Sequence, residues 1–408
     1  MKRLAFTLTV IVLLLVGCTD LSVNPIDESV AQTVNAVVVS TNQMKTPKRT
    51  ATATANPRIV KHCLEIGDKE VPMQEVAKTG TVVLSGDKEN KPPYLLDLQT
   101  GIRYEMPFDQ LYDAGFYGIH ASPDGNHLAY VDRVLNKNNE LVRDVVWVVN
   151  ARGEVEARWI LPIDILNSTW HWLDNERLEF NVHQTQIDGT VDIFYPFSKK
   201  WENVYNELPD LLIDPYYDLH YHWWLVDYNP NLKWVVYISS SKDHWGPTLW
   251  DITTQKQIWK SDDMRAEWDI PRWSPSGNEL AAISNGEMNI IDRSGLVTQI
   301  PKLVPRSEII EFSWSPDGQY MALLVSSNEE DKPGYLMVYD VRSNQIIDYC
   351  LESYNITWVY PPIWSADSQQ FVYGLHEEWA PFFVEIKEEF AVRLLDDSFP
   401  FVWMNSIP

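Results

Sequence analysis

Apolar and polar residues alternate over short stretches along most of the chain, a pattern typical of β-strands. Four of these stretches share nearly the same phrase: SPDGNHLAYV from Ser122, WSPSGNELAAI from Trp273, WSPDGQYMALL from Trp314 and WSADSQQFVYG from Trp364. Pro, Asp and Gly favour successive positions of a tight turn, and the alternating run that follows indicates a half-buried strand. Each phrase therefore predicts a strand, a tight turn and a second strand.

The phrase recurs at the spacing of a propeller blade. Two weaker copies fill the gaps, WLDNERLEFNV from Trp172, with a turn one residue shorter, and YNPNLKWVVYI from Tyr228. The turns of the six copies start 51, 56, 45, 41 and 50 residues apart. Propeller repeats take about 40–50 residues, whereas most solenoid repeats are shorter. A second strand pair follows most copies, as in 94–101 and 335–347. We expect an all-β fold, a β-propeller of four-stranded antiparallel blades.

The two ends of this region supply one more blade. TVVLS at 81–85 resembles a second blade strand without its first, and FPFVWMN at 399–405 resembles a first strand with nothing after it. Pairing of the two would let the C-terminal strand close the ring and leave no long strand edge exposed. Six internal copies and one composite blade predict seven blades, with six or eight as alternatives.

The first residues predict export and lipid attachment. Lys2 and Arg3 precede an apolar run, 4–16, that is too short to span a bilayer and leads into Gly17 and Cys18. This pattern resembles the signal of bacterial lipoproteins, which implies cleavage before Cys18 and attachment of acyl chains such as palmitate to that residue. An ordinary signal peptide with an incidental Cys is the alternative.

The segment after Cys18 is poor in aromatic residues and rich in Thr, Val, Asn, Ala and Ser, so it predicts a flexible linker. We therefore expect a lipoprotein signal peptide at 1–17, a lipid-anchored linker at 18–57 and a propeller at 58–408. The mature protein would lie outside the cytoplasm, held to the membrane by its lipid anchor only. Asp occurs at Asp20 rather than directly after Cys18, which argues against retention in an inner membrane and favours an outer membrane where one exists.

Two further cysteines, Cys63 and Cys350, form an even pair in a chain expected in an oxidising compartment. A disulfide between them is the favoured interpretation, and two separately buried thiols are the alternative. Since Cys350 ends a predicted outer strand, the bond would fix the segment after the linker to the rim of one blade.

Charge and motifs exclude several functions. With 33 basic and 57 acidic residues the net charge is −24, so we expect no nucleic-acid partner. The acidic surface favours solubility, with calcium or a cationic ligand as alternatives.

Motifs of serine hydrolases, zinc peptidases and nucleotide-binding enzymes are absent, so we predict a non-enzyme with no cofactor. His220 and His222, with Asp218, have a metal-like spacing, but a polar pocket lining is the favoured interpretation, and we predict no metal.

The predicted ligand-binding surface is aromatic and lies on loops opposite the SPDG-type turns. Aromatic side chains on loops of a rigid scaffold provide large contact area at little entropic cost. We expect some of these rings to pack between blades instead, as Trp273, Trp314 and Trp364 do. The candidate residues are Tyr217, His220, His222, Trp223, Trp245, Trp268, Trp358, Tyr360 and Trp379.

The phrases WSPDGQYMALL, WSPSGNELAAI and SPDGNHLAYV resemble the repeats of TolB-type, WD-repeat-like propellers from about Thr79 to the C-terminus. That resemblance implies a platform for binding proteins or ligands. The chain lacks room for the separate N-terminal domain of TolB and for the hydrolase domain of propeller-containing peptidases. We expect a non-catalytic monomer that binds an envelope or secreted protein. The alternatives are a carbohydrate-binding or carbohydrate-active propeller and a purely structural spacer of the envelope.

Overall fold

The computed structural model of the 408-residue chain describes most of the region after residue 56. The predicted signal peptide at 1–17, Cys18 and the predicted linker up to residue 56 lie outside the described residues. Among the residues described, no helix is long and apolar enough to cross a membrane. The described residues are 57–64, 69–84, 93–108, 118–135, 141–161, 169–181, 190–211, 226–241, 244–261, 271–284, 286–301, 307–327, 334–353, 361–373, 381–386, 390–395 and 400–406.

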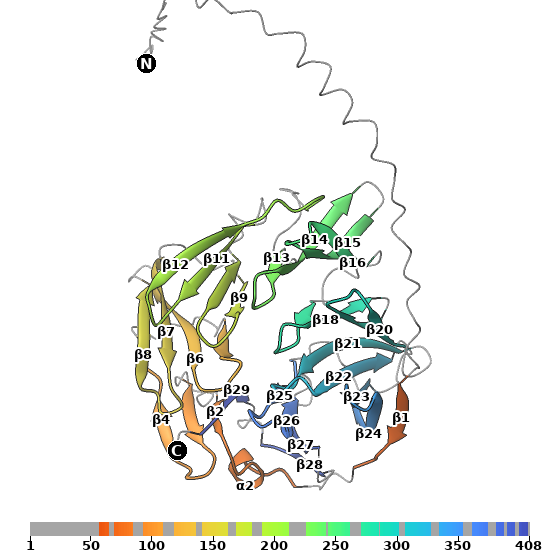
Figure 1. Ribbon diagram of the computed structural model, residues 1–408. Helices are drawn as coiled ribbons and strands as arrows, with labels where there is room; N and C mark the ends of the chain where they lie inside the picture. The colour runs from red at the N-terminus through yellow and green to blue at the C-terminus, as the bar shows by residue number, and fades with distance from the viewer. Residues whose placement is uncertain are drawn as a thin grey trace, which may run out of the picture. The chain divides into compact units, whose positions relative to one another are not determined.

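The chain forms a seven-bladed β-propeller of four-stranded antiparallel sheets, as the turn phrases predict. Each blade starts with an inner strand near the centre and adds strands outward (Figure 1). The first three blades are blade 1, with β5 (Ile119–Ala121), β6 (Leu128–Leu135), β7 (Leu141–Val149) and β8 (Val155–Ile160); blade 2, with β9 (Thr169–Trp172), β10 (Leu178–Asn181), β11 (Thr190–Tyr195) and β12 (Lys200–Tyr205); and blade 3, with β13 (Val226–Tyr228), β14 (Trp234–Ser241), β15 (His244–Asp251) and β16 (Lys256–Lys260).

The remaining internal blades follow the same order, again from the inside outward. They are blade 4, with β17 (Arg272–Trp273), β18 (Glu279–Ser284), β19 (Glu287–Asp292) and β20 (Val297–Ile300); blade 5, with β21 (Ser307–Trp314), β22 (Tyr320–Ser327), β23 (Gly334–Asp340) and β24 (Gln345–Ser353); and blade 6, with β25 (Ile363–Trp364), β26 (Gln370–Tyr373), β27 (Phe382–Glu385) and β28 (Phe390–Arg393).

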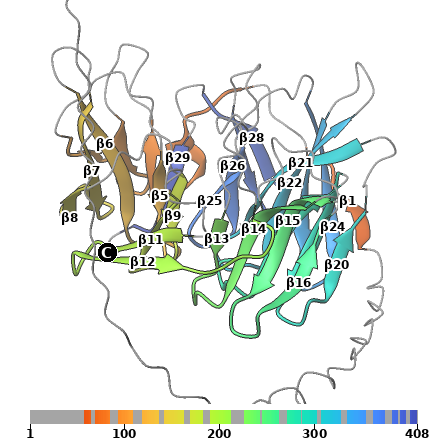
Figure 2. The ribbon, with the colours of Figure 1, turned by 90° about the horizontal axis from the view of Figure 1, so that it is seen from above.

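Blade 7 is built from both ends of the propeller region, which confirms the predicted closure. Its inner strand is the C-terminal β29 (Pro400–Met404), and β2 (Thr81–Leu84), β3 (Tyr94–Asp97) and β4 (Arg103–Glu105) complete it. β29 pairs antiparallel with β2, with Trp403 opposite Val82. Figure 2 shows β29 in the middle of the molecule beside β25 and β5, the inner strands of its two neighbours, which β29 contacts.

Blade 5 carries a fifth strand that the repeat pattern does not predict. β1 (Arg58–Lys61) pairs in parallel with β24, with Ile59 opposite Ile346. Just beyond it, Cys63 and Cys350 form a disulfide, with Cα atoms 4.7 Å apart. The short helix α2 (Met73–Val76) then leads toward β2 and buries Met73. The bond thus fixes the start of the propeller to the rim of one blade.

The core consists of apolar layers between neighbouring blades. One layer joins Val83 of blade 7 to Leu128 of blade 1, and another joins Ala322 of blade 5 to Phe371 of blade 6. The sequence predicts half-buried second strands, but this is wrong: Leu128, Ala129 and Tyr130 are all at most 2% exposed. Each blade has a neighbour on both faces, so both sets of alternating side chains are buried.

The turns form as their sequences predict. In blade 5 the N–H of Gly318 donates to the carbonyl of Ser315 at 2.8 Å, and the Ser315 hydroxyl donates to Asp317 at 2.7 Å. The same hydroxyl accepts the N–H of Tyr320 at 2.9 Å, which starts the second strand. Blade 2 closes its turn one residue earlier, from Leu173 N to Arg177 O. The six turns therefore lie on one face of the propeller.

Candidate site in the central channel

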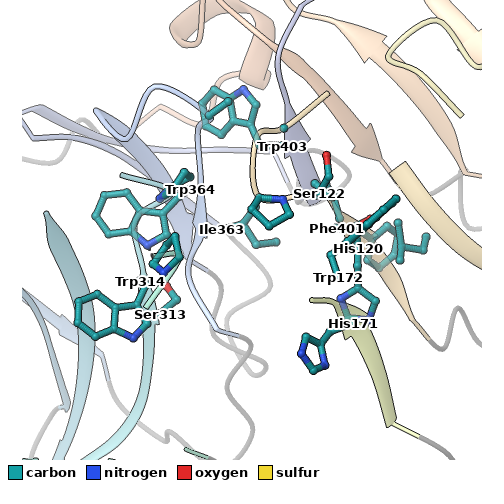
Figure 3. Close-up of a pocket in the computed structure, with 18 of the residues that line it drawn as sticks. His120, Ser122, His171, Trp172, Ser313, Trp314, Ile363, Trp364, Phe401 and Trp403 are labelled. Atoms are coloured by element: carbon teal, nitrogen blue, oxygen red, sulfur yellow. Dashed lines mark hydrogen bonds between the residues drawn. The ribbon is translucent and has the colours of Figure 1, made fainter. Parts of the chain in front are cut away.

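A pocket of about 420 Å³ lies where the inner strands meet, on the side of the SPDG-type turns. Figure 3 shows His120 and His171 on one side of the pocket and Trp314 and Trp364 on the other. Turn residues such as Pro123 form its rim. Pockets of this kind, largely apolar with a few convergent polar groups, are where ligands usually bind.

One position on the inner strand of each blade forms the wall of the channel, and it directly precedes an aromatic residue in blades 2 to 7 and Ala121 in blade 1. Because side chains alternate along a strand, this residue faces away from the preceding blade, where the aromatic ring packs. Its cross-strand partner on the second strand is Ala or Val in six blades and Glu in blade 2. The pairs, from blade 1 to blade 7, are His120–Ala129, His171–Glu179, Asp227–Val236, Arg272–Ala281, Ser313–Ala322, Ile363–Val372 and Val402–Val83.

Three of these side chains gather between blades 2 and 3. Nε2 of His171 lies 3.5 Å from Oδ1 of Asp227, and one donor atom from each of His171, Glu179 and Asp227 lies within 4.8 Å of the other two. Glu179 is completely buried, Asp227 is 15% exposed and His171 is 36% exposed. His171 also lines the pocket, so it stands between the open channel and the buried carboxyls.

The carboxyls in this cluster have few partners. Oε1 of Glu179 accepts a long hydrogen bond from the N–H of Tyr228, at 3.4 Å. Oε2 of Glu179 and Oδ1 of Asp227 have no hydrogen-bond partner among the described atoms. The cations of this region are paired elsewhere: Arg272 with Glu311, at 2.7 Å from Nη1 to Oε1, and Arg177 with Asp174, at 2.6 Å from Nη2 to Oδ2. A buried carboxyl oxygen without a hydrogen-bond partner is costly, so these two oxygens call for an explanation.

The environment shifts the pKa of every member. Burial raises the pKa of Asp227 to about 8, and burial together with the Asp227 carboxyl raises that of Glu179 well above its usual value. Burial lowers the pKa of His171 to about 4, and burial with the nearby His171 lowers that of His120 to about 4. At pH 7 both imidazoles are therefore neutral, and each has one ring nitrogen that carries no proton. Shifts of this kind are characteristic of functional sites.

Almost all of the predicted loop surface falls on residues that the structure does not describe. Tyr217, His220, His222, Trp223, Trp268, Trp358, Tyr360 and Trp379 all lie outside the described residues. Trp245 was expected in a loop spanning 241–247, but this is wrong, because its backbone pairs with Ser240 inside β15. The β14–β15 hairpin continues through that stretch and leaves only Lys242 and Asp243 between the strands. Trp314 and Trp364 are buried, as expected of rings between blades, and Trp273 packs there partly exposed.

The channel cluster was missed because its signal lies in the comparison of the copies. WLDNERLEFNV matches the alternation of the other phrases, and Glu179 reads there as an ordinary polar position of a strand. Only alignment with SPDGNHLAYV and WSPDGQYMALL shows a Glu where the others have Ala. His171 and Asp227 likewise look unremarkable until the propeller brings neighbouring inner strands together.

No family model matches the chain. Among solved structures it is similar to TolB from Acinetobacter baumannii, with 13% identity, 88% of this chain and 98% of that chain covered, and a TM-score of 0.43. It is also similar to the β-propeller domain of Cps50 (Swd1) from Myceliophteria thermophila, with 12% identity, coverage of 74% and 95%, and a TM-score of 0.45. A third is hydrazine synthase from Kuenenia stuttgartiensis, with 15% identity, coverage of 69% and 80%, and a TM-score of 0.40.

These likenesses are distant. All identities are 15% or lower and every TM-score is below 0.5, so no activity or partner follows from them. The seven-bladed fold itself rests on the sheet topology described above.

Proposed function

We propose that this protein is a non-catalytic binding platform, anchored outside the cytoplasm by lipid on Cys18, that takes part of its ligand into the central pocket. The observation that carries the proposal is the pocket itself. Its 420 Å³ falls within the range of about 300–1,000 Å³ typical of ligand sites. Its walls are inner strands held between neighbouring blades, so little conformational entropy is lost when a ligand binds.

The proposed location draws support from the covalent chemistry of the chain. The disulfide between Cys63 and Cys350 is a bond that persists in oxidising compartments. Together with the lipoprotein-like signal ending at Cys18, it favours a protein on the outer side of a membrane. The expected partner is an envelope or secreted protein, bound by a monomer whose pocket accepts one or two of the partner's side chains.

A carbohydrate ligand is the second candidate, since aromatic rings and carboxyls both suit sugars. The carboxyl pair in the channel does not favour hydrolysis, because Glu179 is completely buried and cannot contact a glycosidic oxygen. Sugar binding without turnover remains compatible with the pocket, whose wall includes the rings of Trp314 and Trp364.

Cross-linking and recovery of the lipidated protein from native membranes tests the proposal, with Cys18→Ser as the control for anchoring. A second pair of variants tests the pocket. Ile363 lines the pocket, so Ile363→Trp would fill it, whereas Ile59 is 44% exposed on β1 and Ile59→Trp leaves the pocket open.

We expect one envelope protein to be recovered with the wild type and with Ile59→Trp, and to be lost with Ile363→Trp. Equal recovery with both variants would place binding away from the pocket. If no protein is recovered, a glycan array probed with the same two variants decides whether a sugar is the ligand, and no binding there would overturn the proposal.

A further inference from the structure

We propose that His171, Glu179 and Asp227 bind one divalent transition-metal ion, best fitted by Zn²⁺, in the wall of the central channel. The inference goes beyond the proposed function and rests only on the residues of blades 2 and 3. Three strands supply the ligands: β9 carries His171, β10 carries Glu179 and β13 carries Asp227.

The distances suit a shared ion. Zn²⁺ binds His nitrogen and carboxylate oxygen at about 2.0–2.2 Å, so two ligand atoms in a tetrahedral site lie about 3.3–3.6 Å apart. The 3.5 Å between Nε2 of His171 and Oδ1 of Asp227 is already at that separation. The third donor atom, from Glu179, lies within 4.8 Å of both, so a modest side-chain movement completes the set.

The unpartnered atoms point to a ligand. Among the described atoms, Oε2 of Glu179 and Oδ1 of Asp227 are both buried and have no hydrogen-bond partner. No Lys or Arg in the described part of the chain forms an ion pair with either carboxyl. Arg177 lowers the pKa of Glu179 from a distance but is itself paired with Asp174, so the two carboxyls beside the imidazole have no cation in direct contact, and a bound ion would supply one.

The arrangement is specific to one blade. The position opposite the channel residue is apolar in six blades, as in Ala129 and Val236, and carries a carboxyl only in blade 2, where it faces Asp227 of blade 3. The fold thus does not need a polar residue there. A carboxyl placed where Ala or Val is sufficient indicates a purpose other than packing.

The donor chemistry selects the class of ion. One imidazole with two carboxylates suits Zn²⁺ or Mn²⁺, whereas Ca²⁺ and Mg²⁺ prefer oxygen ligands alone. Three protein ligands leave one coordination position of a tetrahedral ion open. Because His171 lines the pocket, that position would face the channel and a ligand entering from it.

The test uses the purified full chain, stripped with a chelator and then dialysed against ZnCl₂, MnCl₂, CaCl₂ or MgCl₂. Metal content by mass spectrometry and the melting temperature are both measured, in the absence of any partner. Glu179→Gln and Asp227→Asn remove ligand charge at nearly constant volume. Glu156→Gln is the matched control, because it alters a carboxyl 2.6 Å from an imidazole, that of His127, outside the cluster.

We expect one equivalent of Zn²⁺ in the wild type and in Glu156→Gln, with a rise in melting temperature that Ca²⁺ and Mg²⁺ do not produce. Glu179→Gln and Asp227→Asn should each bind Zn²⁺ at least about 100-fold more weakly, since even outer-shell changes cost 10–100-fold. Both variants must melt cooperatively without metal, which shows that they fold.

Two outcomes would overturn the proposal. Absence of bound Zn²⁺ and Mn²⁺ in a folded wild type would leave the two carboxyls as a proton-sharing pair. An equivalent of metal that persists in Glu179→Gln would place the ion elsewhere, for example at His220 and His222. Neither outcome changes whether a partner is recovered from membranes, so that experiment tests the proposed function independently of the metal site.

Discussion

The indole Nε1 of Trp172 donates a hydrogen bond to the backbone carbonyl of His120, 2.9 Å away, and so joins the inner strand of blade 2 to that of blade 1. The same link recurs between blades 5 and 4, where Trp314 donates to the carbonyl of Arg272 at 3.3 Å. In both cases the acceptor belongs to the residue whose side chain forms the channel wall. The aromatic residue of the phrase thus positions the channel as well as filling the core.

Trp172→Phe should lower the free energy of unfolding by about 1–2 kcal/mol, because a buried carbonyl loses its donor and a smaller ring leaves a gap. Trp250→Phe is the matched control. Its Nε1 is buried without a partner among the described atoms, so removing that N–H should cost less or nothing. Urea denaturation of both variants measures the difference. Equal losses would show that ring volume alone accounts for the effect.

The two turns beside blade 7 provide a second test. Blade 7 has no turn between its first two strands, because they come from opposite ends of the propeller, and Gly125 of blade 1 comes close to Ala366 of blade 6. A Cβ on Gly125 would lie 3.1 Å from that of Ala366, whereas a Cβ on Gly101 would meet nothing within 4 Å. Both glycines have φ of +71°, so both substitutions carry the same backbone strain.

Gly101→Ala should therefore cost only that strain, about 1–2 kcal/mol. Gly125→Ala should cost about 1 kcal/mol more, because the added methyl group must displace Ala366 or the Asn405 side chain, whose Nδ2 would lie 3.3 Å away. Thermal and chemical denaturation of the pair isolate the packing contribution. Equal losses in the free energy of unfolding would mean that the turns of blades 1 and 6 can move apart without loss of stability.

The fold was predictable because its information is local and repeated. Each phrase specifies a turn and two strands on its own, and the orphan strands at 81–85 and 399–405 could be paired by elimination. The fifth strand of blade 5 was not predictable. RIVK at 58–61 is short and mostly exposed, and only its pairing with β24 and the adjacent disulfide hold it in place.

The channel site was not predictable from any single segment. His171, Glu179 and Asp227 lie on three strands of two blades, and their proximity depends on the angle at which those blades pack. The sequence pattern instead favoured the aromatic loops, because the residue types there suggest binding without any knowledge of the fold. Glu179 stands out because it is buried. Its burial depends on the closed ring, in which both faces of a blade are covered, and not on the sequence LEF at 178–180.

Glu179 should therefore act against stability when metal is absent. Glu179→Val, which restores the residue type of blades 3, 6 and 7, should raise the free energy of unfolding of the chelator-treated protein by about 1–3 kcal/mol, because it removes a buried carboxyl with an unpartnered oxygen. Glu156→Gln, at a partly exposed pair, should change it by less than about 1 kcal/mol. Denaturation in chelator measures both. A clear loss of stability in Glu179→Val would make the carboxyl a structural residue.

Loss of the disulfide should destabilise β1 more than it destabilises the blades. β1 is held by its pairing with β24 and by the bond between Cys63 and Cys350, and most of its side chains are exposed. Replacing both cysteines with Ser should lower the global free energy of unfolding by about 2–4 kcal/mol, since the bond closes a long loop. The local effect should be larger, because four paired residues and the backbone hydrogen bonds of His62 and Leu64 then hold the segment without a covalent link.

Hydrogen exchange followed by mass spectrometry separates these effects. Amides at 58–64 should exchange at least about tenfold faster in the double variant under native conditions, while those of β22 and β23 keep their protection. Cys18→Ser is the control for a cysteine replaced outside the disulfide and before the propeller region. Unchanged exchange at 58–64 would mean that β-pairing alone holds the strand. Faster exchange throughout blade 5 would mean instead that the bond secures the whole blade, and that β1 and β24 open as one cooperative unit.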